Sequence, residues 1–407
     1  MSLKKITENI FCVNVDLDES ISRFEGIWAI PSGVTINSYI VKGNETALID
    51  VVLDDAKAIK EYEEHLAEIG LSFGKIDHLI LNHLEPDHTG FLTEFRKLNP
   101  SAKIYASKKG IAMVKNFFKI DDNLTEVKTG DTLDLGNSVV LKFFDTPNVH
   151  WPETMMTYCE NGGVLFSCDG FGGYGKLGEK LFDDEHSEES LKQYEHEALR
   201  YYSNIMSSFS SYVIKAIDTV SQVDLKVIAP SHGIIWRKNP QYMIDLYRRY
   251  AGYNKGGACE KEVCVIYGSM YGFTKRGVDA VIKGIEEAGM KYTVHQVPDI
   301  DASYVLADSY KATGLVIAMP TYEYKMFPPM AHILDLFERK HFTDKIALRV
   351  GSWGWSGGAK KEYESRIEKF KWDNLESYEW QGIITAEDEE KLKELGKELC
   401  AKVSEKV

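Results

Sequence analysis

The sequence has no apolar run that approaches the roughly 20 residues needed to cross a bilayer, so we expect no membrane partner. Its beginning is slightly basic but has no apolar signal core, and we therefore expect a cytoplasmic protein. Basic runs are also missing, and 62 acidic against 48 basic side chains give a formal net charge of −14. Because a nucleic-acid-binding face needs clustered lysine and arginine, we expect no nucleic-acid partner.

Cysteine is scarce, and no two cysteines form a Cys-x-x-Cys pair. The six are scattered along the chain, at Cys12, Cys159, Cys168, Cys259, Cys264 and Cys400. This distribution argues against a disulfide framework and against a built-in iron–sulfur or rubredoxin centre. Two nucleotide-binding motifs are absent as well. Without GxxxxGK[ST] nucleoside triphosphate hydrolysis is not indicated, and without GxGxxG a Rossmann dinucleotide site is disfavoured.

The length of 407 residues is too great for one ordinary domain. We predict a first domain over residues 1–255 and a second over 256–407, joined by a glycine-rich linker at 251–258. The first domain mixes strand candidates with helical patterns. One helix is predicted over 54–69, and a long, acidic helical stretch over 188–220.

After the linker, five strand candidates alternate regularly with helical patterns, among them a predicted helix over 326–338. This alternation is typical of a doubly wound parallel sheet, and five strands in about 145 residues fit its flavodoxin-like version. The predicted class of the whole chain is α/β.

Four metal-type side chains lie within six residues after a strand candidate at 78–81, namely His83, Glu85, Asp87 and His88. Alternate positions of an extended chain project to one side, so one pocket can collect the first three. Three later strand ends each add a ligand-type side chain: His150, Asp169 and His232. Four imidazoles and three carboxylates suit iron better than zinc. Two ferrous ions with a bridging hydroxide would leave such a buried site nearly neutral.

A second constellation begins with a loop that follows an apolar strand candidate and precedes a helix, comprising Ser269, Met270, Tyr271, Gly272, Phe273 and Thr274. Backbone N–H groups of such a loop, with the helix N-terminus, can hold a phosphate. Two later strand ends carry small and aromatic residues that can approach and stack on a planar ring: Pro320, Thr321, Tyr322 and Glu323, then Ser352, Trp353, Gly354 and Trp355. The three loops together predict a flavin site.

With both halves in order, the chain resembles a flavodiiron protein (A-type flavoprotein) of the two-domain minimal class. The resemblance covers essentially the whole length and rests on HLEPDH at 83–88, HWP at 150–152, SCDG at 167–170, SHG at 231–233, SMYGFT at 269–274, PTYEY at 320–324 and GSWGWSGG at 351–358. It implies a metallo-β-lactamase-like αββα sandwich followed by a flavodoxin-like domain, with FMN and two iron ions as cofactors. It also implies one iron held by His83, Glu85 and His150, and a second held by Asp87, His88 and His232. Asp169 would bridge the two, and the equivalent of His88 does not coordinate in every member.

The resemblance further implies reduction of dioxygen to water, of nitric oxide to nitrous oxide, or of both. Electrons would come from an external donor such as a rubredoxin, a flavin reductase or a reduced deazaflavin coenzyme. A head-to-tail homodimer, or a dimer of such dimers, would bring the FMN of one subunit to the iron pair of the other. Many members have a histidine where this chain has Glu25, and we take Glu25 and Tyr194 as candidate catalytic residues.

Two other functions stay open at this point. A zinc hydrolase of the metallo-β-lactamase fold, fused to a flavodoxin domain, would hold two zinc ions and turn over a thioester or a lactam. Glu85 and the flavin loops disfavour it. A plain electron carrier with a structural metal would react with neither gas when its flavin is reduced.

Overall fold

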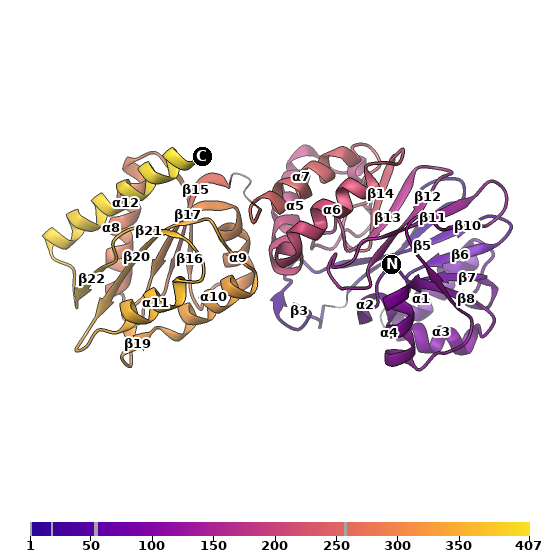
Figure 1. Cartoon of the computed structure of the whole chain (residues 1–407), viewed down its shortest axis with the longest axis horizontal. Coiled ribbons are helices and arrows are strands. Elements are labelled where there is room, and N and C mark those ends of the chain that lie inside the picture. The colour runs from indigo at the N-terminus through magenta and orange to yellow at the C-terminus, as the bar shows by residue number, and fades with distance from the viewer. Residues whose placement is uncertain (1, 18, 53–55, 256–258) are drawn as a thin grey trace. The chain divides into compact units, whose positions relative to one another are not determined.

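The computed structural model describes residues 2–17, 19–52, 56–255 and 259–407. The described chain divides into two compact units (Figure 1), Met1–Tyr202 with Ser211–Arg248, and Ser203–Ser210 with Arg249–Val407. The boundary predicted between residues 255 and 256, and part of the predicted linker, fall on residues 256–258, which lie outside the described ones. That boundary therefore stays a prediction, and each unit is described by itself below.

Two large β-sheets form the centre of the described part of the first unit. One has the order β1–β2–β5–β6–β7–β8–β9 and is parallel from β6 onward, with β1 (Ser2–Lys5), β2 (Ile10–Asp16), β5 (Thr35–Lys42), β6 (Thr46–Ile49), β7 (His78–Ile80), β8 (Lys103–Ser107) and β9 (Leu124–Val127). The other has the order β10 (Thr132–Asp134), β11 (Val140–Asp145), β12 (Met155–Cys159), β13 (Val164–Cys168) and β14 (Val227–Pro230). Only β13 and β14 run parallel in this second sheet.

A buried apolar core joins the inner faces of these sheets, with Tyr39 and Ile80 from the first and Leu141 and Phe166 from the second. A second core covers the outer face of the first sheet with α1 (Ala56–Glu68), α3 (Leu92–Leu98) and α4 (Lys108–Phe118). Beside β13 and β14 lie α5 (Glu188–Tyr201), α6 (Ser210–Val220) and α7 (Pro240–Gly252), as Figure 1 shows. The predicted αββα sandwich is confirmed. The helix predicted over 54–69 is α1, and its first two predicted residues lie outside the described ones.

The helical stretch predicted over 188–220 is helical throughout, but it is not one regular α-helix. A π-helical turn (Tyr202–Met206) and a 3-10 turn (Ser207–Phe209) separate α5 from α6. Serine hydroxyls in this segment bond back to the main chain. Ser207 Oγ donates to the carbonyl of Ser203 (2.7 Å), and Ser210 Oγ donates to that of Ser207 (2.8 Å). Such bonds compete with regular helix geometry, which explains the break.

The second unit has one parallel sheet in the order β16 (Lys291–Gln296), β15 (Glu260–Tyr267), β17 (Ala312–Ala318), β20 (Ile346–Trp353) and β21 (Asp373–Asn374), and β22 (Tyr378–Gln381) also pairs with β20. This is the 2-1-3-4-5 order of a flavodoxin-like fold, as predicted. The helices α8 (Phe273–Glu287) and α12 (Ala386–Lys406) pack on one face of the sheet. The remaining helices are α9 (Ala302–Lys311), α10 (Pro328–Arg339) and α11 (Ala359–Ile367).

The helix predicted over 326–338 begins two residues late. Lys325–Met326 instead forms β19, which pairs with β18 (Thr321–Tyr322) in a short hairpin. Pro328 then opens α10, a position where proline costs a helix no hydrogen bond.

The longest helix of the second unit, α12, crosses α8 at two glycines. A Cβ at Gly284 would lie 2.1 Å from the carbonyl oxygen of Lys393, and a Cβ at Gly396 would lie 2.4 Å from that of Val281. The absence of side chains at both positions lets the two backbones touch. No helix in the described part of the chain is both long enough and apolar enough to cross a membrane.

Candidate functional site

The seven predicted metal ligands converge in the first unit, from four separate segments. His83 and Glu85 follow β7, and Asp87 and His88 lie on the short helix α2 (Pro86–Thr89), for which Glu85 is the N-cap. The other three come from the loop between β11 and β12 and from the ends of β13 and β14, namely His150, Asp169 and His232. The site therefore occupies the carboxyl ends of strands, where sheet-based sites are usually built.

The first group of ligands surrounds one oxygen of Glu85. Its Oε2 lies 3.0 Å from Nε2 of His150 and 3.2 Å from Nε2 of His83. Oδ2 of Asp169 approaches the same two nitrogens, at 3.3 Å for His150 and 3.4 Å for His83. The four side chains offer ligand atoms that all lie within 4.8 Å of one another.

The second group lies on the other side of Asp169. Oδ2 of Asp87 is 3.2 Å from Nε2 of His232 and 3.5 Å from Nε2 of His88. Oδ1 of Asp169 lies 3.1 Å from His88 and 3.2 Å from His232. The two oxygens of Asp169 thus face two different groups, which is the arrangement of a bridging carboxylate, and His88 points into the second group with the others.

An irregularity in the backbone of β13 orients the side chain of Asp169. The pairing of β13 with β14 shifts register between Phe166 and Cys168, and Cys168 has a left-handed conformation with φ 51°. A bulge of this kind redirects the side chains next to it. Asp169 follows directly, is 1% exposed, and turns between the two groups instead of continuing the strand.

Buried polar atoms without partners show that the cluster fits a pair of cations. Within the described residues, both carboxylate oxygens of Asp87, Oδ2 of Asp169 and Nε2 of His232 make no hydrogen bond. Buried polar groups almost always have a partner, and leaving one without costs free energy. Positive ions between the two groups would satisfy all of these atoms, and the nitrogen and carboxylate donors are those that iron accepts.

The electrostatics of the site point the same way. Burial lowers the pKa of His83, but hydrogen bonds to Glu153 and Glu85 outweigh it and raise the pKa to about 10. Burial raises the pKa of Asp169, but the surrounding imidazoles, His88 first, hold it well below its usual value. The carboxylates thus attract positive charge strongly. Bound metal ions would take the place of the protons that the imidazoles otherwise hold.

Glu153 supports the first group and was not predicted. Its side chain is 2% exposed, and Oε1 lies 2.7 Å from Nδ1 of His83 while accepting the N–H of Leu84 (3.0 Å). A carboxylate behind a ligating imidazole fixes its orientation and its tautomer. The sequence shows Glu153 only as the residue after His-Trp-Pro, which carries no sign of contact with a residue 70 positions earlier.

Strand β5 holds His232 in place. Nδ1 of His232 donates to the carbonyl of Thr35 (3.2 Å), which leaves Nε2 for the cluster. The side-chain amide of Asn37 donates to the carbonyls of Pro230 (2.9 Å) and Gly233 (3.0 Å). The turn after β14 is therefore tied on both sides of the ligand.

The two predicted catalytic residues, Glu25 and Tyr194, differ in their surroundings. Glu25 is exposed on a hairpin of β3 (Arg23–Phe24) and β4 (Trp28–Ala29), and its Oε2 accepts the indole N–H of Trp28 (3.0 Å). The hairpin reaches the cluster through Phe24, whose ring lies edge-on to His232 at 5.4 Å. Tyr194 is buried, and its hydroxyl accepts the N–H of Ile234 (3.2 Å). Catalytic roles for Glu25 and Tyr194 stay predictions.

Tyr201 is a further tyrosine beside the cluster, and sequence reasoning missed it. Its ring lies 5.9 Å from that of His232, and it is fully buried. No described residue bonds its hydroxyl. Burial, and then the negative charge of Asp169, raise its pKa well above the usual value, so the hydroxyl stays protonated. Nothing in the run Tyr201-Tyr202 indicates which ring faces the ligands.

The three predicted flavin loops meet in the second unit, at the carboxyl ends of β15, β17 and β20. Oγ1 of Thr274 and Oγ of Ser352 are 2.8 Å apart, which joins the first loop to the third. The N–H of Ala359 donates to Oγ1 of Thr321 (3.3 Å), which joins the third to the second. At the start of α8, Gly272 has φ 86°, a left-handed conformation that favours glycine.

Exposed aromatic rings surround these loops. Tyr271 is 86% exposed, Trp355 is 71% exposed and Tyr324 is 64% exposed, whereas Trp353 is only partly so. The rings of Tyr324 and Trp355 lie 4.8 Å apart at 81°. In the same group of loops, a Cβ at Gly351 would lie 2.1 Å from the carbonyl oxygen of Met319, so two backbone segments approach closely there. Exposed aromatic rings on such loops fit a planar cofactor, because exposed apolar patches mark binding sites.

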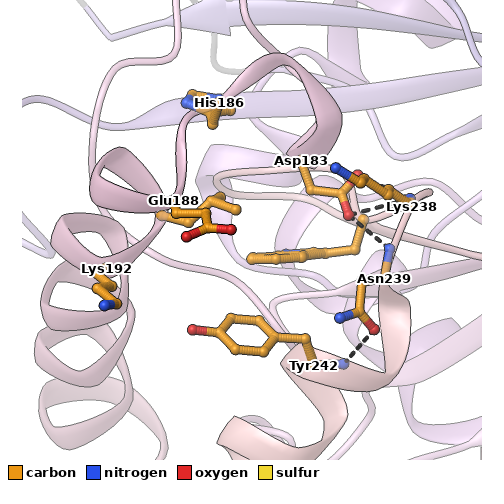
Figure 2. Close-up of a pocket in the computed structure, with 9 residues that line it drawn as sticks. Asp183, His186, Glu188, Lys192, Lys238, Asn239 and Tyr242 are labelled. Carbon is orange, nitrogen blue, oxygen red and sulfur yellow. Dashed lines mark hydrogen bonds between the residues drawn. The ribbon is translucent and has the colours of Figure 1, made fainter.

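A cavity of about 330 Å³ also opens in the first unit (Figure 2). It is lined by Asp183, His186, Glu188, Leu191, Lys192, Trp236, Lys238, Asn239 and Tyr242. Figure 2 shows Asp183 directed at the backbone of the Lys238–Asn239 segment, whose N–H groups its carboxylate accepts. None of the seven clustered ligands lines this cavity, so it is separate from the candidate metal centre.

Comparison with known proteins assigns the family. The ODP family beta lactamase model matches residues 34–233, and the flavodoxin model matches residues 265–400. An anaerobic nitric oxide reductase flavorubredoxin of Vibrio vulnificus (strain YJ016) is 33% identical over 356 residues, covering 86% of this chain and 70% of its own. A solved variant of the flavo di-iron protein from Thermotoga maritima has a TM-score of 0.89 at 30% identity, covering 99% of this chain and 98% of its own. The chain belongs to the flavodiiron protein family.

Another structure similar to this flavodiiron protein is that of rubredoxin oxygen:oxidoreductase from Desulfovibrio gigas. Its TM-score is 0.92 at 26% identity, covering 100% of this chain and 99% of its own. These relatives confirm the predicted oxidoreductase and its cofactors, FMN and a diiron centre, over a zinc hydrolase.

Proposed function

We propose that this flavodiiron protein reduces dioxygen to water, nitric oxide to nitrous oxide, or both, with electrons from an external donor. The observation that carries the proposal is the position of Asp169, whose two oxygens each face a separate set of ligands at 3.1–3.4 Å. That arrangement supports a pair of metal ions rather than a single structural one. The names of the relatives support both substrates, since one is a nitric oxide reductase and another an oxygen oxidoreductase.

In this proposal, one iron is held by His83, Glu85 and His150, and the other by Asp87, His88 and His232, with Asp169 between them. When bound, a reduced iron pair would supply two electrons, which suffice to reduce two nitric oxide molecules to nitrous oxide and water, and a flavin would supply the two more that reduction of dioxygen to water needs. The chain holds these ligands in place through Glu153 and the backbone of Thr35. Fixed ligands need little rearrangement during the reaction.

The residues around the second group control water and protons. Phe24 and Tyr201 pack their rings against His232 and are 7% and 0% exposed, so they exclude bulk water from that side. The Tyr201 hydroxyl is protonated and has no partner in the described part of the chain, so it can donate a hydrogen bond to a ligand between the two groups. Dioxygen and nitric oxide both gain negative charge as they are reduced, and a donor at this position stabilises that charge.

We assign FMN to the three loops of the second unit. The hydroxyls of Ser269 and Thr274 and the N-terminus of α8 surround the expected place of the phosphate. The segments Pro320–Glu323 and Ser352–Trp355 would line the ring. Because the two cofactor sites lie in different units, we propose a head-to-tail homodimer, or a dimer of such dimers, in the cytoplasm. A monodisperse and fully active monomer in light scattering would contradict this assembly.

Gas consumption with an external donor tests the function. A rubredoxin with its reductase is the first donor to try, since the similar Desulfovibrio gigas protein is named for rubredoxin. The iron- and FMN-loaded chain is expected to consume dioxygen or nitric oxide in electrode assays, and the zinc-loaded chain is not. Turnover of a thioester or lactam by a two-zinc form, with no gas consumption by the iron form, would establish a hydrolase instead.

The pair Tyr201→Phe and Tyr194→Phe distinguishes the two tyrosines. Losing the Tyr201 hydroxyl is expected to slow turnover with the preferred gas roughly tenfold, the worth of a hydrogen bond to a charged group. Iron and FMN content should not change, because the ring and its packing stay. The Tyr194→Phe change removes only the bond from Ile234 and should affect stability more than turnover. The reverse order of effects would return the catalytic role to Tyr194.

A further inference from the structure

Arg349 is a buried cation in the interior strand β20 of the second unit. Its side chain is 1% exposed, and within the described residues Nε and Nη1 donate no hydrogen bond, while Nη2 has only the carboxylate of Glu379 close to it. A guanidinium is rarely buried without a full set of partners, because removing its charge from water is costly. An arginine of this kind in a sheet core needs an explanation beyond packing.

The guanidinium is displaced toward the flavin loops. A Cβ placed on Gly351 would lie 3.0 Å from Nη2 of Arg349, so the side chain runs along the strand toward its carboxyl end. Its ion-pair partner is Glu379, with Nη2 and Oε1 2.7 Å apart, and Glu379 lies opposite Gly351 in the pairing of β20 with β22. The next residue is Ser352, whose hydroxyl contacts Thr274 of the phosphate loop. The positive charge therefore lies beside Gly351, the residue that precedes the third flavin loop.

Glu379 balances this charge only in part. Its side chain is 20% exposed whereas that of Arg349 is 1% exposed, so water screens the carboxylate more than the guanidinium. The guanidinium is therefore the less screened charge of this pair. Charges in a buried setting act over longer distances than charges in water.

We propose that Arg349, with Glu379 as its counter-charge, sets the reduction potential of the flavin held by these loops. The inference rests on the FMN site proposed above. Two electrons from the external donor and one proton from water leave the flavin with one more negative charge than its oxidised form. A fixed guanidinium stabilises the form with the extra negative charge, so it makes reduction of the flavin easier.

The test uses full-length, FMN-loaded protein and the variants Arg349→Gln and Glu379→Gln. Arg349→Gln removes the cation and leaves the carboxylate, so the flavin potential in spectroelectrochemical titration is expected to fall. Glu379→Gln removes the negative charge that balances the guanidinium, so the flavin potential is expected to rise. We expect each change to alter the equilibrium of this two-electron reduction about tenfold, which corresponds to about 30 mV. A purely structural role for the pair would not give shifts of opposite sign.

Two further measurements keep the outcomes distinct. Arg349→Lys keeps the positive charge, so the flavin potential should stay near that of the unchanged protein. If Arg349→Gln does not fold, the potentials of Arg349→Lys and Glu379→Gln together test the role of Arg349. FMN content is measured first from absorbance. Failure of the unchanged protein to bind FMN would contradict the proposed cofactor site. The role of Arg349 would be overturned if FMN is bound but the flavin potential does not rise in Glu379→Gln. It would also be overturned if the potential shifts in the same direction in Arg349→Gln and Glu379→Gln.

Discussion

Replacing Asp169 with asparagine is expected to remove most of the bound iron and nearly all turnover, with FMN retained. Asparagine has one carbonyl oxygen where aspartate has two charged ones, so it cannot serve both ligand groups. The change also removes a buried negative charge that balances four imidazoles. Outer residues that only orient a ligand typically change metal affinity by 10–100-fold, so loss of the shared ligand should cost on the order of 100-fold or more. Iron per chain, measured by elemental analysis, and flavin absorbance report the two cofactors separately.

Asp121→Asn is the matched control for that change. Asp121 belongs to the same unit, and its side chain is 78% exposed, so losing its charge should alter neither iron nor turnover. If Asp169→Asn kept two iron ions per chain and full activity, Asp169 would not bridge the groups.

Substituting alanine for Gly351 is expected to weaken FMN binding while leaving the iron centre intact. The new methyl group would lie 2.1 Å from the carbonyl oxygen of Met319, at the base of the loop that carries Thr321 and Tyr322. The backbone would have to move, and overpacking of this kind typically costs about 1–3 kcal/mol. FMN affinity should therefore fall roughly tenfold to 100-fold, as measured by fluorescence titration of the apoprotein.

Gly357→Ala serves as its control within the same loop. A Cβ at Gly357 meets nothing within 4 Å, and its φ is not in the left-handed region, so FMN affinity should stay unchanged. Equal losses in both variants would mean that the loop, and not the close approach at Gly351, controls binding. Unchanged affinity in Gly351→Ala would remove this loop from the flavin site.

The sequence predicts that the seven candidate ligands lie close together because most of them follow strands. Residues such as Asp169 and His232 come next after apolar runs, and the ends of neighbouring strands meet at one edge of a sheet. Their positions in the sequence therefore indicate that they lie close together in space. The flavin loops are predictable for the same reason, and all three lie at strand ends as expected.

The supporting residues could not be predicted because their roles depend on partners far away in the chain. Glu153 acts through His83, and Tyr201 differs from Tyr202 only in which way its ring turns. In the sequence, Arg349 is one polar residue within an apolar strand, and nothing there indicates its partner. Only the pairing of β20 with β22 in the folded chain places Glu379 beside it. The break between α5 and α6 was not predicted because serine also occurs within regular helices. The sequence does not show that the serine hydroxyls here bond to the backbone.

Rapid mixing of the fully reduced protein with dioxygen and, separately, with nitric oxide tests the central claim most directly. The protein is prepared without oxygen, loaded with iron and FMN, and followed by flavin absorbance. The account predicts fast reoxidation by at least one of the two gases, and loss of that fast phase in Asp169→Asn. Slow reoxidation by both gases, in protein shown to carry two iron ions and one FMN per chain, would contradict it.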